Sequence, residues 1–319
     1  MNTPVVFLVF NRPEPARRVF ERIRQARPPK LLVVCDGPRA HVPTDAGRVA
    51  EVRGIIAKGV DWPCEVLTHY AETNMGCRER VRSGLDWAFS IAQEAIILED
   101  DCLPDPSFFP YCETLLERYR DEPKVMHIGA NNFQGWRRPT QDSYYFSKYN
   151  HIWGWACWRR SWQKYDYNLA SWTRPGVRER ISLSFDSDQE KEYWLAKFDG
   201  ITQQFDQVTT WDYQWTYTCW LHEGLSICPA TNLVTNIGIG IDGTHCGDDA
   251  KKLLVPARSI KTIRHPATLQ RNIKADQFTF DLVYPYRDPN PYKRAFYSAR
   301  IALGAARKKL LGSLFSRKK

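Results

Sequence analysis

The first 130 residues alternate short apolar runs with stretches of helical periodicity, and this alternation limits the folds open to the chain more than any other feature. The apolar runs lie at residues 5–10, 31–35, 65–70, 95–98 and 125–130. Strands too apolar for an exposed face belong in a mostly parallel sheet that helices cover on both sides. We therefore predict an α/β fold with a mostly parallel central sheet flanked by helices.

Four helices are expected between these runs, because apolar residues recur there every three or four positions. Pro13 and Pro15 suit the first turn of the first helix. The expected apolar faces consist of Ala16, Val19, Phe20 and Ile23; of Val49, Val52 and Ile56; of Val81, Leu85, Ala88, Phe89 and Ala92; and of Phe108, Cys112, Leu115, Leu116 and Tyr119.

Polar residues stand where four of the expected strands end. Ligands bind beyond the carboxyl ends of the strands in sheets of this kind, so these residues should face one crevice. They are Asn11 and Arg12, Asp36, Asn74, and Glu99, Asp100 and Asp101.

The strongest signal is the acidic triplet of residues 99–101 in "AIILEDDCLPDP". Three neighbouring carboxylates repel one another unless a cation neutralises them, and Mg²⁺ or Mn²⁺ takes carboxylate and phosphate oxygens as ligands. On extended backbone, Glu99 and Asp101 would point to one side and Asp100 to the other, before the two prolines end regular structure. An isolated triplet would indicate an acidic turn. Its place opposite Asp36 and Asn74 favours a metal site.

Asp36, in "VVCDGPR", ends the second strand, where a nucleotide-binding sheet places an acid for the ribose or the base edge. The alternative is an ordinary Asp-Gly turn. The chain has neither G-x-G-x-x-G after its first strand nor G-x-x-x-x-G-K, which disfavours dinucleotide and P-loop chemistry.

The segment "TNMGCRERVRSG" places Asn74 and Gly76 before a helix whose first turns carry Arg78, Arg80 and Arg82. A helix N-terminus with nearby guanidinium groups can hold a diphosphate. A capped helix with a solvated basic face is the alternative.

Tryptophan and tyrosine become dense after residue 131, as in "YNHIWGWACWRRSWQKYDY". Aromatic rings with nearby polar groups suit stacking on sugars, although packing explains most tryptophans. We expect Trp153, Gly154, Trp155 and Trp211 to bind the acceptor or sugar. The predicted organisation is a nucleotide-sugar-binding half (1–130), an acceptor-binding and catalytic half of the same domain (131–288) and a basic amphipathic C-terminal helix (289–319).

Asp212 and His245 are further candidates for chemistry. Trp211 and Trp215 give Asp212 apolar surroundings, which would raise its pKa toward that of a useful general base. A structural Asp that caps a helix is the alternative. His245, in "DGTH", could be a metal or pyrophosphate ligand, whereas a lone His is usually structural.

The net charge of +9 comes from the end of the chain. Residues 293–319 hold nine Lys or Arg and no acid, which leaves 36 basic and 36 acidic residues in the first 292. A neutral body disfavours nucleic-acid binding. The tail mixes basic residues with large apolar ones, so we expect it to lie on an anionic membrane surface; a solvated, disordered end is the alternative.

The nine cysteines are scattered and never spaced as C-x-x-C, so neither a disulfide framework nor a zinc cage is expected. No apolar stretch is long enough to cross a bilayer, and the N-terminus has no basic leader. We expect a cytoplasmic protein that is peripheral on the inner face of the cytoplasmic membrane.

Asn74, Gly76 and Gly84, followed by the acidic strand end, keep the N-x-G spacing of a large inverting glycosyltransferase family, often called family 2. The E-D-D triplet resembles that of the N-acetylglucosaminyltransferase that initiates complex N-glycans, where the third acid contacts the metal. Carried over, this acid is Asp101. The resemblance implies the Rossmann-like glycosyltransferase-A fold, in which an acidic strand end binds the metal of a metal-nucleotide-sugar.

Later segments add to this resemblance. "TTWDYQWTY" is similar to that family's W-D-D-W segment, whose acid is the catalytic base; the carry-over is Asp212, with Tyr213 where the second Asp would stand. "NLVTNIGIGIDGTHC" (232–246) and "IWGWACWRRSW" resemble bacterial proteins described as haemolysin-like or as nucleotide-diphospho-sugar transferases. The resemblance covers roughly residues 4–250.

These observations predict a metal-dependent inverting glycosyltransferase that moves a sugar from a nucleoside diphosphate sugar, favoured to be UDP-linked, to a glycan or lipid-linked acceptor. Asp212 would be the base, and Asp101 with His245 would hold Mn²⁺ or Mg²⁺. The expected nucleotide-binding residues are Asn11, Arg12, Asp36, Asn74, Gly76, Arg80 and Asp100.

Three other classes stay open. A glycoside hydrolase also uses paired acids but needs no nucleotide pocket. A sugar-nucleotide pyrophosphorylase shares the crevice but needs a glycine-rich phosphate loop near the N-terminus, which is absent. A catalytically silent carbohydrate-binding or membrane-active protein would tolerate the changes Asp101→Ala and Asp212→Ala.

Overall fold

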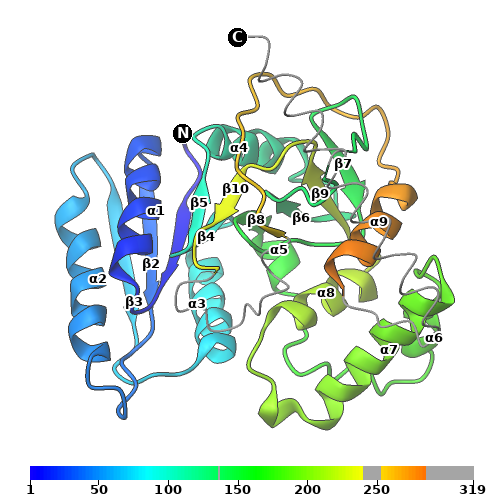
Figure 1. Cartoon of the computed structure of the whole chain (residues 1–319), viewed down its shortest axis with the longest axis horizontal. Coiled ribbons are helices and arrows are strands. Elements are labelled where there is room, and N and C mark those ends of the chain that lie inside the picture. The colour runs from blue at the N-terminus through cyan, green and yellow to red at the C-terminus, as the bar shows by residue number, and fades with distance from the viewer. Residues whose placement is uncertain (136, 240–252, 285–319) are drawn as a thin grey trace, which may run out of the picture.

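The computed structural model describes residues 1–135, 137–239 and 253–284, and its centre is a sheet of eight strands. The strand order is β3-β2-β1-β4-β8-β6-β9-β7 (Figure 1). All of these strands except β7 and β8 run in one direction, so the expected α/β fold with a mostly parallel sheet is confirmed. The bounds are β1 Val5–Val9, β2 Lys30–Cys35, β3 Glu65–Tyr70, β4 Glu94–Glu99, β6 Val125–Gly129, β7 Tyr144–Ser147, β8 Trp155–Trp158 and β9 Leu225–Pro229.

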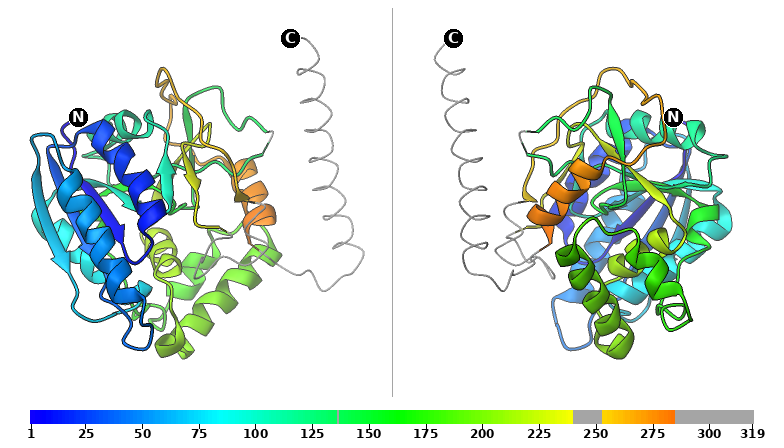
Figure 2. Two further views of the ribbon diagram at one scale, coloured as in Figure 1. Left: turned by 60° about the vertical axis from the view of Figure 1, so that its left-hand side comes forward. Right: turned by 90° about the vertical axis from the view of Figure 1, so that its right-hand side faces the viewer.

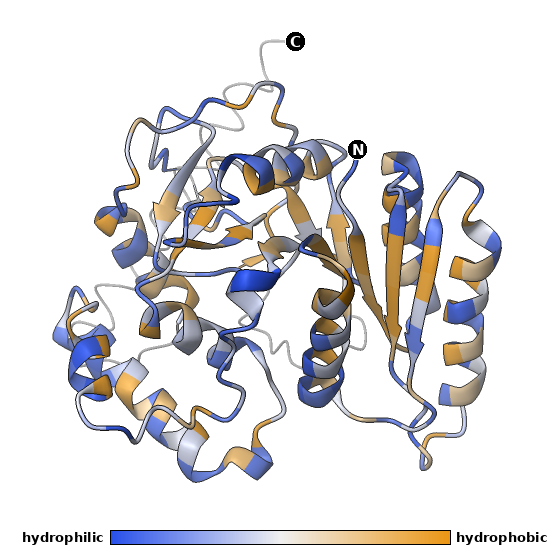
Figure 3. Ribbon diagram, turned by 180° about the vertical axis from the view of Figure 1, so that it is seen from behind, coloured by the Kyte–Doolittle hydropathy of each residue, from blue (hydrophilic) through white to orange (hydrophobic). Residues whose placement is uncertain are grey.

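Helices cover both faces of the first four strands. The helices α1 (Pro13–Ala26) and α2 (Asp45–Gly59) lie on one face, and α3 (Cys77–Ile91) lies on the other (Figures 1 and 3). Figure 3 shows that the strands between them are coloured as hydrophobic along most of their length. The apolar faces predicted for α1, α2, α3 and α4 (Phe108–Arg118) are buried as expected, and Pro13 begins α1.

The regular alternation of strand and helix stops after β6. The later helices are α5 (Arg159–Trp162), α6 (Val177–Ser182), α7 (Asp188–Gln203), the 3-10 helix η1 (Phe205–Gln207), α8 (Asp212–Leu221) and α9 (Ile273–Val283). Figure 2 shows α7 and α9 on the side of the molecule away from α1 and α2. Strands from both sides of residue 130 share one sheet, and the predicted functional division at that residue stays a prediction.

A short antiparallel ribbon stands beside the main sheet. It pairs β5 (Cys102–Pro104) with β10 (Val234–Asn236). As expected, regular structure ends at the prolines after the acidic triplet: β5 stops at Pro104, and the next element, α4, begins at Phe108. Proline is tolerated in β5 because both strands of a two-stranded ribbon are edge strands. The ribbon brings the segment after β10 to the acidic triplet.

In the part of the chain that the structure describes, no helix is both long and apolar enough to span a membrane. His245 and the predicted amphipathic helix at 289–319 lie outside the described residues.

Candidate functional site

A cavity of about 1260 Å³ opens where the carboxyl ends of β1, β2 and β4 meet. The expectation that the polar strand ends face one crevice is confirmed. Site residues expected from the sequence that line it are Asn11, Arg12, Asp36, Asn74, Gly76, Arg80, Asp100, Asp101, Trp153, Trp211 and Asp212.

The acidic tip, by which we mean Glu99, Asp100 and Asp101, forms one wall of this cavity. The strand β4 ends at Glu99, and the next two residues form a turn. Nη2 of Arg12 binds Oδ1 of Asp100, and Nη1 of Arg12 lies 3.0 Å from Oδ2 of Asp101. The backbone N–H of Phe10 donates to the other oxygen of Asp100 at 3.2 Å. The prediction that the side chains of Asp100 and Asp101 point to opposite sides is therefore wrong, because both bind Arg12. The extended backbone of β4 ends at Glu99, and the turn that follows brings the two carboxylates together.

The acidic tip carries more negative charge than Arg12 can neutralise. Burial raises the pKa of Glu99 well above the usual carboxyl range, and the charges of Asp101 and Asp100 raise it further. Burial also raises the pKa of Asp100, against the attraction of the Arg12 guanidinium. No described side chain donates a hydrogen bond to the carboxylate of Glu99, which is half-buried at the cavity wall. A cation at this wall would relieve the repulsion.

The acidic tip fits a cation that a ligand helps to hold, and it does not form a complete protein cage. Among the described residues, no three or more His, Cys, Asp or Glu side chains form a group that could hold a metal ion. Mg²⁺ needs only one or two carboxylates when phosphates and waters complete its shell. Oδ1 of Asp101 is available for this role, since its one hydrogen bond within the described residues comes from the weak Cys102 thiol donor at 3.5 Å.

Asp36 fixes the loop before α3. Its Oδ1 accepts from the backbone N–H groups of Gly37 (2.8 Å) and Met75 (2.9 Å). Its Oδ2 accepts from Nδ2 of Asn74 (2.9 Å) and the backbone N–H of Gly76 (3.2 Å). Burial raises the pKa of Asp36, and these hydrogen bonds oppose the rise. The Asp36 carboxylate thus anchors this loop, and the predicted contact of Asp36 with a nucleoside stays a prediction.

Asn11 and Arg80 are also bound within the protein. Nδ2 of Asn11 donates to Oδ1 of Asp45 at 2.7 Å, and Arg39 binds the same carboxylate. Hydrogen bonds from Arg39 hold the pKa of Asp45 well below its usual range. Arg80 is buried and donates to the backbone oxygen of His69 at the end of β3. Both residues therefore shape the cavity wall, whatever they bind inside the cavity.

Asp212 lies across the cavity as the first residue of α8. The segment before it is fixed to α3, because Arg78 donates to the backbone oxygen of Phe205 and stacks 4.2 Å from that ring's centroid. An acid in the first turn is favoured by the helix dipole. This placement suits a base that faces bound substrate, and the catalytic role stays a prediction.

The aromatic residues divide between the cavity and the core. Trp153 lines the cavity, whereas Trp155 has no exposed surface and stacks on Trp211 with ring centroids 5.7 Å apart. The predicted sugar contact of Trp155 is therefore wrong, because β8 lies inside the sheet between β4 and β6. Gly154 has φ of +72° and lies against Val234, outside the cavity lining, so it does not support the predicted sugar contact.

Sequence reasoning missed other residues of the cavity wall, among them Arg48, Tyr213, Asn236 and Gly238. A Cβ on Gly238 would lie 2.4 Å from Oδ2 of Asp101, so a larger residue here would displace the Asp101 side chain. The glycines of "NIGIG" were the available signal. Arg48 belongs to no motif and could not have been found, whereas Tyr213 lies in the W-D-D-W-like segment beside Asp212 and was not chosen as a site residue.

No protein-family model matches the chain, and no curated protein matches its sequence. Similar solved structures include the galactosyltransferase LgtC in complex with donor and acceptor sugar analogs (10% identity, 68% of this chain and 70% of that chain, TM-score 0.36). Another is apo mouse xyloside xylosyltransferase 1 (11% identity, 68% of this chain and 81% of that chain, TM-score 0.32). A third is apo UDP-glucose pyrophosphorylase (9% identity, 75% of this chain and 94% of that chain, TM-score 0.33). At such low identities and TM-scores, the activity has to be argued from the residues themselves.

Proposed function

We propose that the chain is a metal-dependent glycosyltransferase that takes a sugar from a nucleoside diphosphate sugar, with UDP as the nucleotide, in an inverting reaction. The observation that carries this proposal is the acidic tip, where three carboxylates line a large cavity and two of them, Asp100 and Asp101, share the Arg12 guanidinium. Sites for drug-sized ligands measure about 300–1,000 Å³, so this cavity has room for a nucleotide sugar and part of an acceptor.

Asp101, supported by Glu99 and Asp100, would hold the metal at the carboxyl end of β4. When bound, Mn²⁺ or Mg²⁺ supplies charge stabilisation for the departing diphosphate. The cavity wall formed by Asn11 and the Asp36 loop would receive the nucleoside. Asp212 would accept the proton of the acceptor hydroxyl as that oxygen attacks the anomeric carbon. His245 is proposed as an additional ligand on sequence grounds alone.

The acceptor is proposed to be a glycan or a lipid-linked sugar. Trp153 lines the cavity and is partly exposed, so it offers ring surface for a sugar, whereas Trp211 is 2% exposed and packs in the core. The basic and apolar composition of residues 289–319 supports attachment to an anionic membrane surface on the cytoplasmic side, where such an acceptor would be met.

A thermal-shift panel of UDP, GDP, CMP and dTDP, each with and without Mn²⁺, tests this proposal. We expect one nucleotide to raise the Tm only when Mn²⁺ is present, and Asp101→Ala to abolish this rise. Asp121→Asn is the matched control, because Asp121 is an exposed acid away from the cavity. Stabilisation that is equal without metal, or unchanged in Asp101→Ala, would contradict the assignment.

Asp212→Asn separates the base from the binding groups. We expect it to keep the metal-dependent Tm rise and to lose about 10²–10⁴-fold in transfer rate. Hydrolysis of an oligosaccharide without any nucleotide would instead favour a glycoside hydrolase. Full transfer activity in Asp212→Asn would remove that residue from the mechanism.

A further inference from the structure

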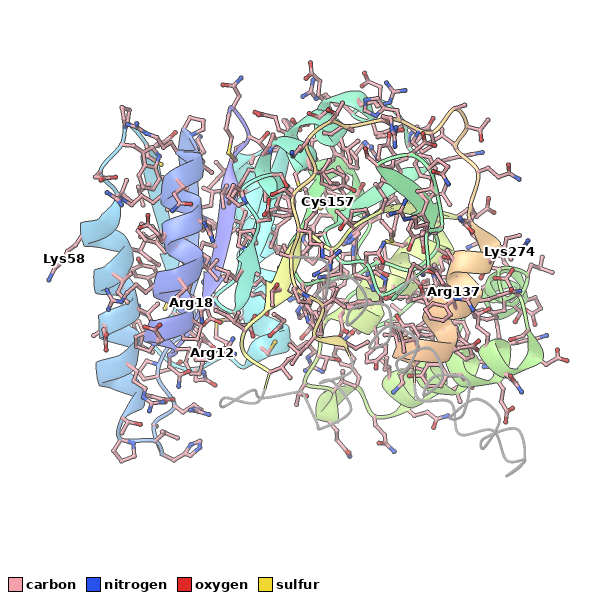
Figure 4. The ribbon with its side chains drawn as sticks, turned by 45° about the horizontal axis from the view of Figure 1, so that its top comes forward. Arg12, Arg18, Lys58, Arg137, Cys157 and Lys274 are labelled. Carbon is pink, nitrogen blue, oxygen red and sulfur yellow. The ribbon has the colours of Figure 1, made fainter. Side chains whose placement is uncertain are left out.

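Arg12 occupies a position from which it can serve either the acidic tip or a ligand in the cavity. It is the N-cap of α1, with φ of −116° and ψ of 82°, so its backbone is outside the helix. Figure 4 shows it at the beginning of α1, with Arg18 further along the same helix. The Arg12 side chain retains 21% of its exposure, and the residue lines the cavity.

The two carboxylates that Arg12 binds are held very differently. Asp100 has 3% side-chain exposure, and both of its oxygens have donors, one from Arg12 and one from the Phe10 backbone N–H. Asp101 has 13% exposure, and apart from Arg12 its carboxylate receives only the weak Cys102 thiol donor within the described chain. Asp100 is therefore the fixed partner of Arg12, and Asp101 is the exchangeable one.

The backbone at Gly238 packs directly against the pair formed by Arg12 and Asp101. A Cβ on Gly238 would lie 2.4 Å from Oδ2 of Asp101 and 2.8 Å from Nη1 of Arg12. Gly238, Arg12 and Asp101 all line the cavity, so the pair is part of the cavity wall.

A divalent cation on Oδ1 of Asp101 and the Arg12 guanidinium on Oδ2 compete for the charge of one carboxylate, because two cations held side by side repel each other. Arg12 presents a planar fork that also suits phosphate oxygens. We propose that Arg12 is an exchangeable counter-cation: it holds Asp101 in the ligand-free protein, yields Asp101 to the divalent cation, and then binds the diphosphate that arrives with it. This inference rests on the proposed function, and it adds a competition within the chain that sets the metal affinity of the site.

Binding of Mn²⁺ alone to the full chain, counted as free Mn²⁺ by electron paramagnetic resonance, tests the exchange. We expect Arg12→Met to bind Mn²⁺ at least tenfold more tightly than the unmodified protein. Arg18→Met should leave the affinity unchanged, because Arg18 is an exposed residue of the same helix. UDP should strengthen Mn²⁺ binding strongly in the unmodified protein and weakly in Arg12→Met, which lacks the phosphate ligand.

A second variant locates the gain. Adding Asp101→Asn to Arg12→Met should remove the extra Mn²⁺ affinity, and a gain that persists would overturn the role of Asp101. Arg12→Lys keeps the charge but loses the bidentate fork, so it should show a smaller gain in the same direction. This variant decides the question if Arg12→Met does not fold.

The outcomes separate the inference from the proposed function. Equal or weaker Mn²⁺ binding in folded Arg12→Met and Arg12→Lys would overturn the exchange, whatever UDP does. Tighter Mn²⁺ binding in Arg12→Met that disappears with Asp101→Asn would support competition at Asp101. If, in addition, no nucleotide changed the Tm or the Mn²⁺ affinity, both the proposed function and the phosphate role of Arg12 would be overturned.

Discussion

Replacement of Asp36 tests whether this residue holds the cavity wall together. In Asp36→Ala, the backbone N–H groups of Gly37, Met75 and Gly76 lose their acceptor. Each unsatisfied buried donor costs about 1–3 kcal/mol. The cost is reduced because Met75 is 38% exposed, so water reaches the loop, and because a buried charge is removed. We expect a net loss of about 3 kcal/mol.

This loss corresponds to roughly 4–5 °C in Tm for a chain of 319 residues. Urea unfolding followed by circular dichroism measures the free energy, and the thermal-shift panel measures nucleotide binding. Asp36→Asn should fall between Asp36→Ala and the unmodified protein, because the amide keeps one acceptor oxygen. Asp61→Ala is the control, since Asp61 pairs with Arg24 at the surface, where such pairs contribute about 0–1 kcal/mol.

The two proposed roles of Asp36 give different results. A residue that holds the loop lowers stability with or without nucleotide, whereas a residue that only binds nucleotide lowers affinity and leaves stability unchanged. Stability of Asp36→Ala within about 0.5 kcal/mol of the unmodified protein would refute the loop-anchoring argument.

Three further predictions follow from burial and close packing. Trp155→Ala should cost about 3–5 kcal/mol of unfolding free energy, whereas Trp153→Ala should mainly weaken acceptor binding; equal stability losses would contradict their placement. Gly238→Ala should cost about 1–2 kcal/mol and weaken the Mn²⁺-dependent Tm rise, because the new methyl group displaces Asp101. Burial lowers the pKa of His127 to about 3, below its value in the unfolded chain. The contribution of neutral His127 to the free energy of unfolding is therefore complete above pH 6.5 and is lost as the pH falls towards 3. Between pH 6.5 and 4, the free energy of unfolding should therefore fall by about 3 kcal/mol less in His127→Gln than in the unmodified protein. Parallel pH profiles of the two proteins in urea unfolding would contradict this.

The local pattern of the sequence was sufficient for the first four helices and the strands that alternate with them. Val19 and Ile23 are buried on the predicted face of α1, and the run at residues 95–98 became β4. Such patterns are readable because an apolar helix face or strand must be covered wherever it lies in the fold. The crevice followed from the same logic, since parallel strands place their carboxyl ends at one edge.

The contacts that each polar side chain makes could not be predicted from local sequence patterns. Arg12 is 88 residues from Asp100, and Asp36 is 39 residues from Met75, so their contacts depend on how β1, β2 and β4 are paired. The sequence placed these residues at one crevice. It did not show that Arg12 already binds the acids or that the Asp36 carboxylate is already occupied.

The aromatic half shows the same limit. Trp153 and Trp155 are two positions apart in one motif, yet one lines the cavity and the other is in the core. The difference arises because β8 enters the sheet between β4 and β6, antiparallel to both. The sequence by itself therefore determined the elements and the polar strand ends, whose burial is a local property. Only the tertiary structure decided which charges meet and which rings face the cavity, because those contacts depend on strand order and register.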